Sequence, residues 1–471
     1  MVGQRTAVAG VEAEFVHVKL GDARLDERAR LIAGRIEAAP GSSFPDQMDS
    51  IAEREALYRF LANDAVTMTE LLRSHVLQTH HRMANRGKVR ILHDTTDFKF
   101  SGEREGLGTL KRGAKGFFAH VALAVGGDEV ADPLGVLGVR PHVLTEVAAR
   151  RKKTRSQRVM ATHAKKRSEK LSSRWENLAI DISKDLPSEV RAIHVMDQEA
   201  DDYVLLAELQ KAKLSFVVRV SPTRLLGSGG PTIREELASE PARLFRTVSM
   251  NPRAKKASSN HPARAERDAQ LAVRWGKIKL PRGRHIQSDV DALELYAVHV
   301  FEPNPPPGEV AIEWMLFTSE RVESLDDAAA IVDDYRTRWM IEEYFKALKT
   351  GCAFEKRQLT TLDGLLRALG LFIPAAWHLL LLRYLGRAPR PRPAAVVFDA
   401  EQLLLLRTLL EKRRHHLAAE PTVRDVMLGI AALGGHIKNN GDPGWIVLGR
   451  GFTRFLDAEE VWRLARRSDQ S

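Results

Sequence analysis

Residues 89–96, Val-Arg-Ile-Leu-His-Asp-Thr-Thr, mark the point where the chain changes from a helical to an extended pattern. The β-branched and apolar run predicts a strand, and Asp94 with the two threonines after it is typical of a turn at the strand end. Residues 190–196 repeat the pattern, and Asp197 follows them directly. Because open sheets place their sites at the carboxyl ends of central strands, both aspartates are candidate site residues. The alternative for each is an ordinary turn-forming role.

The segments around these two strands predict an α/β fold. Further strands are expected at 117–125, 134–144 and 214–220, with helices at 164–185 and 200–211. A meander of strands followed by β-α-β crossovers gives a mixed sheet with helices packed on it.

Three domains are expected along the 471 residues. Residues 1–75 have apolar side chains at helical spacing and several arginines, which predicts a small basic helical domain. Residues 76–361 are expected to hold the sheet, with a β-rich insertion at about 222–309 that contains glycine-rich and proline-rich turns. Residues 362–471 are expected to be mostly helical.

The composition limits the classes of function. Lys and Arg outnumber Asp and Glu by 72 to 61, and this net charge of +11 favours a polyanionic partner. Basic residues cluster at 150–170 and 253–267, where the alternative is a solvated loop. The single cysteine, Cys352, excludes an intrachain disulfide, disfavours a cysteine-based zinc site and fits a reducing, cytoplasmic setting.

Neither a signal peptide nor a membrane span is expected. The first thirty residues carry charges throughout. The apolar run 366–382 is interrupted by Arg367, Pro374 and His378, so it predicts a pair of buried helices.

A predicted helix at 326–349 carries four polar residues at spacings of 3, 4 and 7: Tyr335, Arg338, Glu342 and Lys349. At roughly 100° per residue they fall within about 60° of one another. A carboxylate flanked by cations and a phenol suits chemistry on a phosphodiester. The alternative is an ordinary Arg–Glu pair on a solvated helix face.

The three carboxylates Asp94, Asp197 and Glu342 are the predicted catalytic triad and metal ligands. Meeting at one site, they would bind two divalent ions roughly 3.5–4 Å apart. One ion would ionise a water or a DNA 3′-hydroxyl, and the other would stabilise the leaving oxygen. Oxygen ligands suit Mg²⁺, with Mn²⁺ as a substitute.

These motifs resemble those of the bacterial DDE transposases of insertion sequence family four, over nearly the whole chain. The most specific part is the spacing Tyr-x2-Arg-x3-Glu-x6-Lys at 335–349. Residues 94–96 are similar to the first aspartate motif of that family and 197–201 to the second, in which Gln198 departs from the usual arginine. Near the C-terminus, Gly449 and Phe452 depart from tryptophans of the family pattern.

The resemblance implies an RNase H-like catalytic domain in a cut-and-paste transposase. Such an enzyme cleaves the inverted-repeat ends of its element through a hairpin intermediate and transfers the 3′-hydroxyl ends into target DNA. The N-terminal helical domain would bind the DNA ends and the C-terminal helices would form a homodimer on paired ends. Double-stranded DNA is then the partner, in the bacterial cytoplasm at the nucleoid, with no membrane and no small-molecule substrate.

The resemblance also implies DNA contacts outside the triad. Tyr335 and Arg338 would hold a phosphate, and Lys349 would assist near the transposon end. Trp314 would stack on a flipped-out base, although a core tryptophan is an equal alternative. Arg219 matches a basic residue near the cleaved strand, with a surface arginine as the alternative. The remaining candidates, in the N-terminal domain, are Arg28 and Arg59.

Two other functions remain open at this stage. One is a nuclease of the same fold that cleaves DNA without joining it. The other is a DNA-binding inhibitor or regulator derived from a transposase.

Overall fold

The computed structural model describes residues 10–84, 86–110, 113–127, 131–144, 173–250, 252, 265–388, 391–413, 415–437 and 441–468. The chain divides into two compact units. The first consists of Met1–Gly87, Thr95–Ala149 and Met340–Ser471, and the second of Lys88–Asp94 and Arg150–Trp339. The predicted basic stretch 150–170, most of the stretch 253–267 and the start of the predicted helix 164–185 lie outside the described residues.

The first unit begins with short helices whose starts are set by side-chain caps. The elements are η1 (Val11–Phe15), α1 (Ala23–Ala38), α2 (Phe44–Gln47), α3 (Ile51–Ala62) and α4 (Met68–Met83). Asp22, Ser50 and Thr67 each accept a backbone N–H in the first turn of the helix that follows, which satisfies a donor that the helix itself leaves free.

Strand β1 (Lys88–Phe100) continues six residues past Asp94, so the predicted turn at Asp94 is wrong. Its last residues belong to the first unit, where Phe98 and Phe100 pack on Phe117 and Phe354. This tertiary packing of aromatic rings keeps the backbone extended. In the same unit β3 (Lys115–Gly126) pairs with β2 (Gly108–Thr109) and with β4 (Asp132–His142).

Helix α11 (Leu362–Leu385) is continuous through Pro374, so the predicted pair of helices is wrong. The helix is buried along most of its length against α1, α4 and β4, and this packing offsets the backbone hydrogen bond that proline removes. Among the described helices it alone is long and apolar enough to cross a membrane, and 78% of its most apolar window is buried in the protein.

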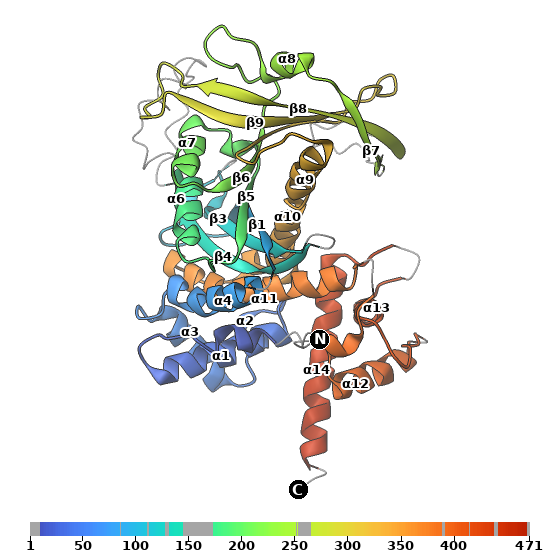
Figure 1. Ribbon diagram of the computed structural model, residues 1–471. Coiled ribbons are helices and arrows are strands. Elements are labelled where there is room, and N and C mark those ends of the chain that lie inside the picture. The colour runs from blue at the N-terminus through green and yellow to red at the C-terminus, as the bar shows by residue number, and fades with distance from the viewer. Residues whose placement is uncertain are drawn as a thin grey trace. The chain divides into compact units, whose positions relative to one another are not determined.

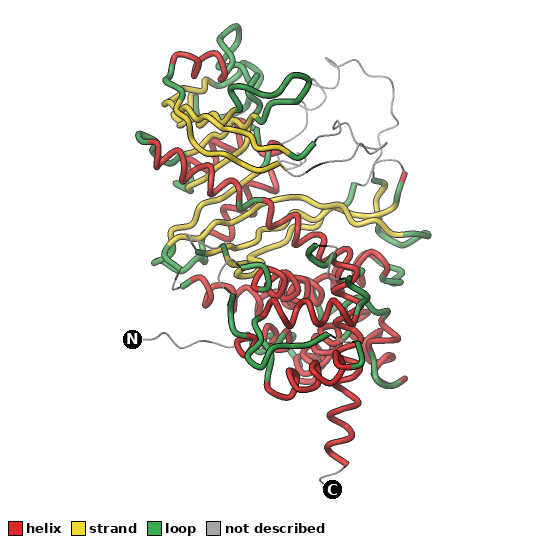
Figure 2. Tube along the Cα trace, turned by 90° about the vertical axis from the view of Figure 1, so that its right-hand side faces the viewer, coloured by secondary structure: helices red, strands yellow, loops and turns green. Residues whose placement is uncertain are grey.

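Three helices follow in the first unit: α12 (Ala400–Glu411), α13 (Val423–Leu433) and α14 (Trp445–Ser468). They share an apolar core that includes Leu406, Ile430 and Phe455. Helix α14 runs on toward the C-terminus as one long helix (Figures 1 and 2).

The second unit is built on a mixed sheet, as the sequence predicted. Besides β1 it contains β5 (Arg191–Met196), β6 (Ser215–Val220), β7 (Arg243–Met250), β8 (Arg267–Pro281), β9 (Ala292–Phe301) and β10 (Glu313–Thr318). The strand order is β1-β5-β6-β10-β9-β8-β7. The first three strands in this order are parallel, and the other neighbours pair antiparallel.

Helices cover both faces of this sheet. On one side lie α6 (Ser173–Ser183) and α7 (Tyr203–Lys211), and on the other lies α9 (Leu325–Arg336), as Figure 1 shows. The short helix α8 (Ile233–Glu236) and strand β7 fall in the predicted β-rich insertion but were not themselves predicted.

The predicted helix 326–349 is interrupted. It consists of α9, a turn at Thr337–Arg338, α10 (Trp339–Lys346) and a π-helical turn, η6 (Ala347–Gly351). The Thr337 hydroxyl donates to the Asp334 carbonyl at 2.6 Å, and the Arg338 N–H donates to the Tyr335 carbonyl at 3.0 Å. A threonine hydroxyl that bonds the preceding turn in this way competes with the regular helical pattern.

Candidate active site

Asp94 and Asp197 follow neighbouring positions on two parallel strands. Strands β1 and β5 pair in register from Lys88 opposite Arg191 to His93 opposite Met196, and each aspartate is the next residue. Both aspartates are half-buried. The Asp197 carboxylate accepts the Glu199 N–H at 2.8 Å, which fixes the start of a short 3-10 helix. The structure therefore places these two predicted residues at neighbouring positions of the sheet.

A buried chain of hydrogen bonds joins the same two strands. The His93 Nε2 and His194 Nδ1 atoms are 2.9 Å apart, and His194 Nε2 is 3.0 Å from the Ser183 hydroxyl. Because that hydroxyl donates to the Ala179 carbonyl at 2.6 Å, its oxygen accepts a hydrogen bond from the His194 Nε2–H group. Burial lowers the pKa of His194 to about 4, so its ring is neutral at pH 7. Strand alternation turns both rings away from the aspartate face.

Four of the predicted DNA-contacting residues gather in the second unit. The Tyr335 hydroxyl interacts with both Arg219 and Arg338, and the Tyr335 ring meets Trp314 edge-on with centroids 5.6 Å apart. The sheet register explains part of this arrangement, because Arg219 on β6 lies opposite Leu316 on β10 and so shares a face with Trp314.

Arg338 links this cluster to the first aspartate. Its Nη1 atom is 3.2 Å from Asp94 Oδ2. Burial raises the pKa of Tyr335, against the opposing effect of Arg338 and Arg219, so the phenol keeps its proton and can donate it. Two guanidinium groups and one phenol form a donor set that suits a phosphate oxygen. Trp314 is half-buried, which leaves part of its ring accessible.

Glu342 and Lys349 belong to the first unit. Glu342 is half-buried on α10, and Lys349 lies in the π-helical turn. Lys349 Nζ is 3.3 Å from Asp97 Oδ1 and 5.5 Å from the centre of the Phe98 ring. Burial would raise the pKa of Asp97, but Lys99 and Lys349 hold it below its usual value. Asp97 was not among the predicted residues, although its place three residues after Asp94 was visible in the sequence.

The donor set is compatible with a hard cation. Within the described ranges, no three side chains of His, Cys, Asp or Glu gather as a metal site. Asp94 and Asp197 supply oxygen donors of the kind that Mg²⁺ prefers, and the guanidinium of Arg338 beside Asp94 shows that this carboxylate accommodates a positive charge.

The last two candidates lie in the N-terminal helices. Arg28 is half-buried on α1. Arg59 is exposed on α3, 3.6 Å from Glu55.

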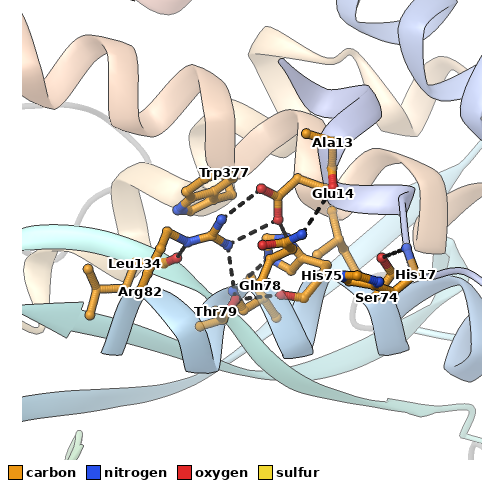
Figure 3. A network of polar contacts seen from close by, with 12 residues as sticks. Ala13, Glu14, His17, Ser74, His75, Gln78, Thr79, Arg82, Leu134 and Trp377 are labelled. Carbon is orange, nitrogen blue, oxygen red and sulfur yellow. Dashed lines mark hydrogen bonds and ion pairs between the residues drawn. The ribbon is translucent and has the colours of Figure 1, made fainter. Parts of the chain in front are cut away.

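A buried polar network anchors the start of these helices to α4 and β4 (Figure 3). Glu14 accepts a hydrogen bond from His75 Nδ1 at 2.5 Å and two from Arg82 at 2.7 and 3.0 Å. The Val136 N–H donates to His75 Nε2 at 2.9 Å, which fixes the tautomer of the ring. Arg82 in turn lies 4.1 Å from the centre of the Trp377 ring.

Comparison with known proteins finds two domains in the chain. A family model described as transposase DNA-binding matches residues 9–66, and one described as transposase DDE domain matches residues 154–375. Together they span more than half of the sequence. Asp197 and Glu342 lie inside the second match, and Asp94 lies outside it.

Among solved structures, the chain is similar to a piggyBac transposase determined in a synaptic complex with hairpin DNA. The two are 11% identical, with a TM-score of 0.35, over 80% of this chain and 72% of that one.

Proposed function

We propose that this chain, whose two matched domains are those of a DDE transposase, is a cut-and-paste enzyme of insertion sequence family four. Its RNase H-like sheet domain would cleave the inverted-repeat ends of its element through a hairpin intermediate and join their 3′-hydroxyl ends to target DNA. It would act as a homodimer on paired ends in the bacterial cytoplasm. The sequence motifs support this finer assignment.

The observation that carries the proposal is the position of Asp94 and Asp197, each directly after the last paired residue of neighbouring parallel strands, with Asp94 in contact with Arg338 of the Arg338, Tyr335 and Arg219 cluster. Carboxylates beside a phosphate-binding donor set are the combination that phosphodiester chemistry needs. The Tyr-x2-Arg-x3-Glu-x6-Lys spacing supports Glu342 as the third carboxylate, and Glu342 lies within the residues matched as transposase DDE domain.

The proposed roles follow from the chemistry of each side chain. Asp94, Asp197 and Glu342 would hold Mg²⁺ ions, which when bound activate an oxygen nucleophile and stabilise the leaving oxygen. Arg338 and Arg219 would hold non-bridging phosphate oxygens, and the protonated Tyr335 would donate a further hydrogen bond. Positioning of this kind lowers the barrier because the phosphate is oriented before attack.

The test is Mg²⁺-dependent cleavage of the element's own end DNA, taken from the sequence flanking its gene. We expect Asp94→Asn, Asp197→Asn and Glu342→Ala each to reduce the cleavage rate at least about a thousand-fold, which is on the order of 4 kcal/mol. The matched control is Glu294→Gln, which removes an exposed carboxylate that is paired with Lys277 on β8. Cleavage by a triad variant within tenfold of wild type would exclude that residue from the mechanism.

The products separate the proposal from its alternatives. A transposase yields DNA in which the element's 3′ end is joined to target, a nuclease of the same fold yields cut ends only, and a regulator yields neither. Gel analysis of one reaction that contains labelled end DNA and supercoiled target distinguishes all three.

A further inference from the structure

A basic groove of about 550 Å³ lies within the first unit. Three segments form it: the loop at Gly41–Ser42, the π-helical turn with the residues that follow it, and the first three turns of α14. Four cations line it, namely Lys349, Lys356, Arg450 and Arg454. None of the lining residues that the structure describes is acidic.

Glycines allow the three segments to meet. A Cβ atom at Gly41 would lie 3.2 Å from the Gly351 carbonyl oxygen, and one at Gly449 would lie 3.5 Å from the same atom. The segments therefore approach one another through backbone, and the longer basic side chains stand around the opening. Helix α14 also begins at the groove, so its free N–H groups add partial positive charge.

The four cationic side chains differ in whether other protein groups already bind them. Arg454 donates a hydrogen bond to the Leu433 carbonyl at 2.5 Å, and Lys349 forms an ion pair with Asp97. Lys356 and Arg450 are exposed, and neither forms an ion pair among the described residues. Like charges that surround one groove repel each other, and a bound polyanion relieves that repulsion.

We propose that this groove binds the phosphate backbone of the duplex at the transposon end. The inference rests on the proposed function, because it takes DNA as the substrate. It extends that function to Lys356 and Arg450, which no sequence motif or family match assigns to DNA.

The parts of the sequence to which the lining residues belong favour the transposon end, rather than target DNA, as the bound duplex. Gly41 and Ser42 fall inside the region matched as transposase DNA-binding, and Lys349 closes the motif that begins at Tyr335. A duplex held by the N-terminal helices and directed to the catalytic motif therefore meets this groove.

The test is the salt dependence of DNA binding by the double variant Lys356→Gln with Arg450→Gln. Loss of two phosphate contacts should reduce the slope of log affinity against log salt by about 1.8 and weaken binding about thirty-fold at 0.15 M salt. Fluorescence anisotropy with a labelled end duplex measures both quantities. The control double variant, Lys184→Gln with Lys412→Gln, removes the same charge from exposed positions outside the groove and should bind like wild type.

Several outcomes overturn the proposal. An unchanged salt slope does so, and so does a loss of affinity confined to unrelated target duplex. A change in oligomeric state at constant DNA affinity would make the groove a protein interface instead. Failure of the proposed function is separate, because it would appear as wild-type protein that binds DNA without cleaving or joining it.

Discussion

At the scale of single residues, the Glu14 carboxylate is a buried charge that depends on its partners. Burial alone would raise its pKa, but hydrogen bonds and charges from His75 and Arg82 lower the pKa to about 2, from an ordinary value of 4.5. Because the folded pKa is the lower one, the stabilising contribution is fully present above pH 4.5 and is lost as pH falls toward 2. A shift of this size corresponds to about 3 kcal/mol.

The variant Glu14→Gln removes the charge and keeps an acceptor for His75. We expect it to unfold at least about 3 kcal/mol more easily at pH 7, with the difference from wild type shrinking as pH falls from 4.5 to 2. Urea unfolding of both proteins, monitored by hydrogen exchange of the α4 amides, measures that difference in unfolding free energy. A difference in unfolding free energy that stays constant with pH would show that the Glu14 charge is not what stabilises the contact.

At the scale of elements, the hydrogen bonds from His93 to His194 to Ser183 join β1, β5 and α6 behind the two aspartates. Burial lowers the pKa of His194 to about 4, below its ordinary value of 6.5. The neutral ring thus stabilises the second unit above pH 6.5, and this contribution, on the order of 3 kcal/mol, is lost as pH falls from 6.5 to 4.

We therefore expect the second unit to lose stability at a higher pH than the Glu14 contact does. Amide exchange in β5, corrected for its intrinsic pH dependence, should accelerate between pH 6.5 and 4 in wild type. The variant His194→Gln should be less stable at pH 7 and show no acceleration in that window. The same acceleration in both proteins would assign the acid sensitivity to another group.

The strands were predictable from sequence because a β-branched run followed by an acid is a local signal. The strands at 190–196 and at its sheet partner could be predicted without knowledge of distant contacts. The interrupted helix was not predictable, since Thr337 breaks it through one hydroxyl bond to Asp334 that competes closely with the regular pattern. The extension of β1 to Phe100 depends on rings that come from elsewhere in the chain.

The candidate site likewise contains some residues that the sequence predicted and others that only the folded structure identifies. The motif spacing predicted Tyr335 and Arg338 together, but only the sheet register placed Arg219 beside them. The histidine pair was missed because two histidines in separate strands carry no spacing signal until the strands are paired. Asp97 was missed because it matters only once Lys349 lies next to it.

At the scale of the whole molecule, the chain passes between its two units inside the proposed catalytic motifs. Of the four crossings, one follows Asp94 and another follows Trp339, three residues before Glu342. The proposed chemistry therefore requires a carboxylate from the first unit to join two from the second. Activity measurements alone do not show whether the three share an ion.

Iron-directed backbone cleavage tests that requirement without relying on DNA cutting. Fe²⁺ in place of Mg²⁺, with ascorbate and peroxide, produces radicals that cut the polypeptide close to the bound metal. If the triad shares its ions, fragments should end near residues 94, 197 and 342, and excess Mg²⁺ should suppress all three cuts together. The variant Asp94→Asn should weaken every cut, because one ligand serves the common site. Cuts near 94 and 197 without one near 342, even with end DNA present, would remove Glu342 from the metal site.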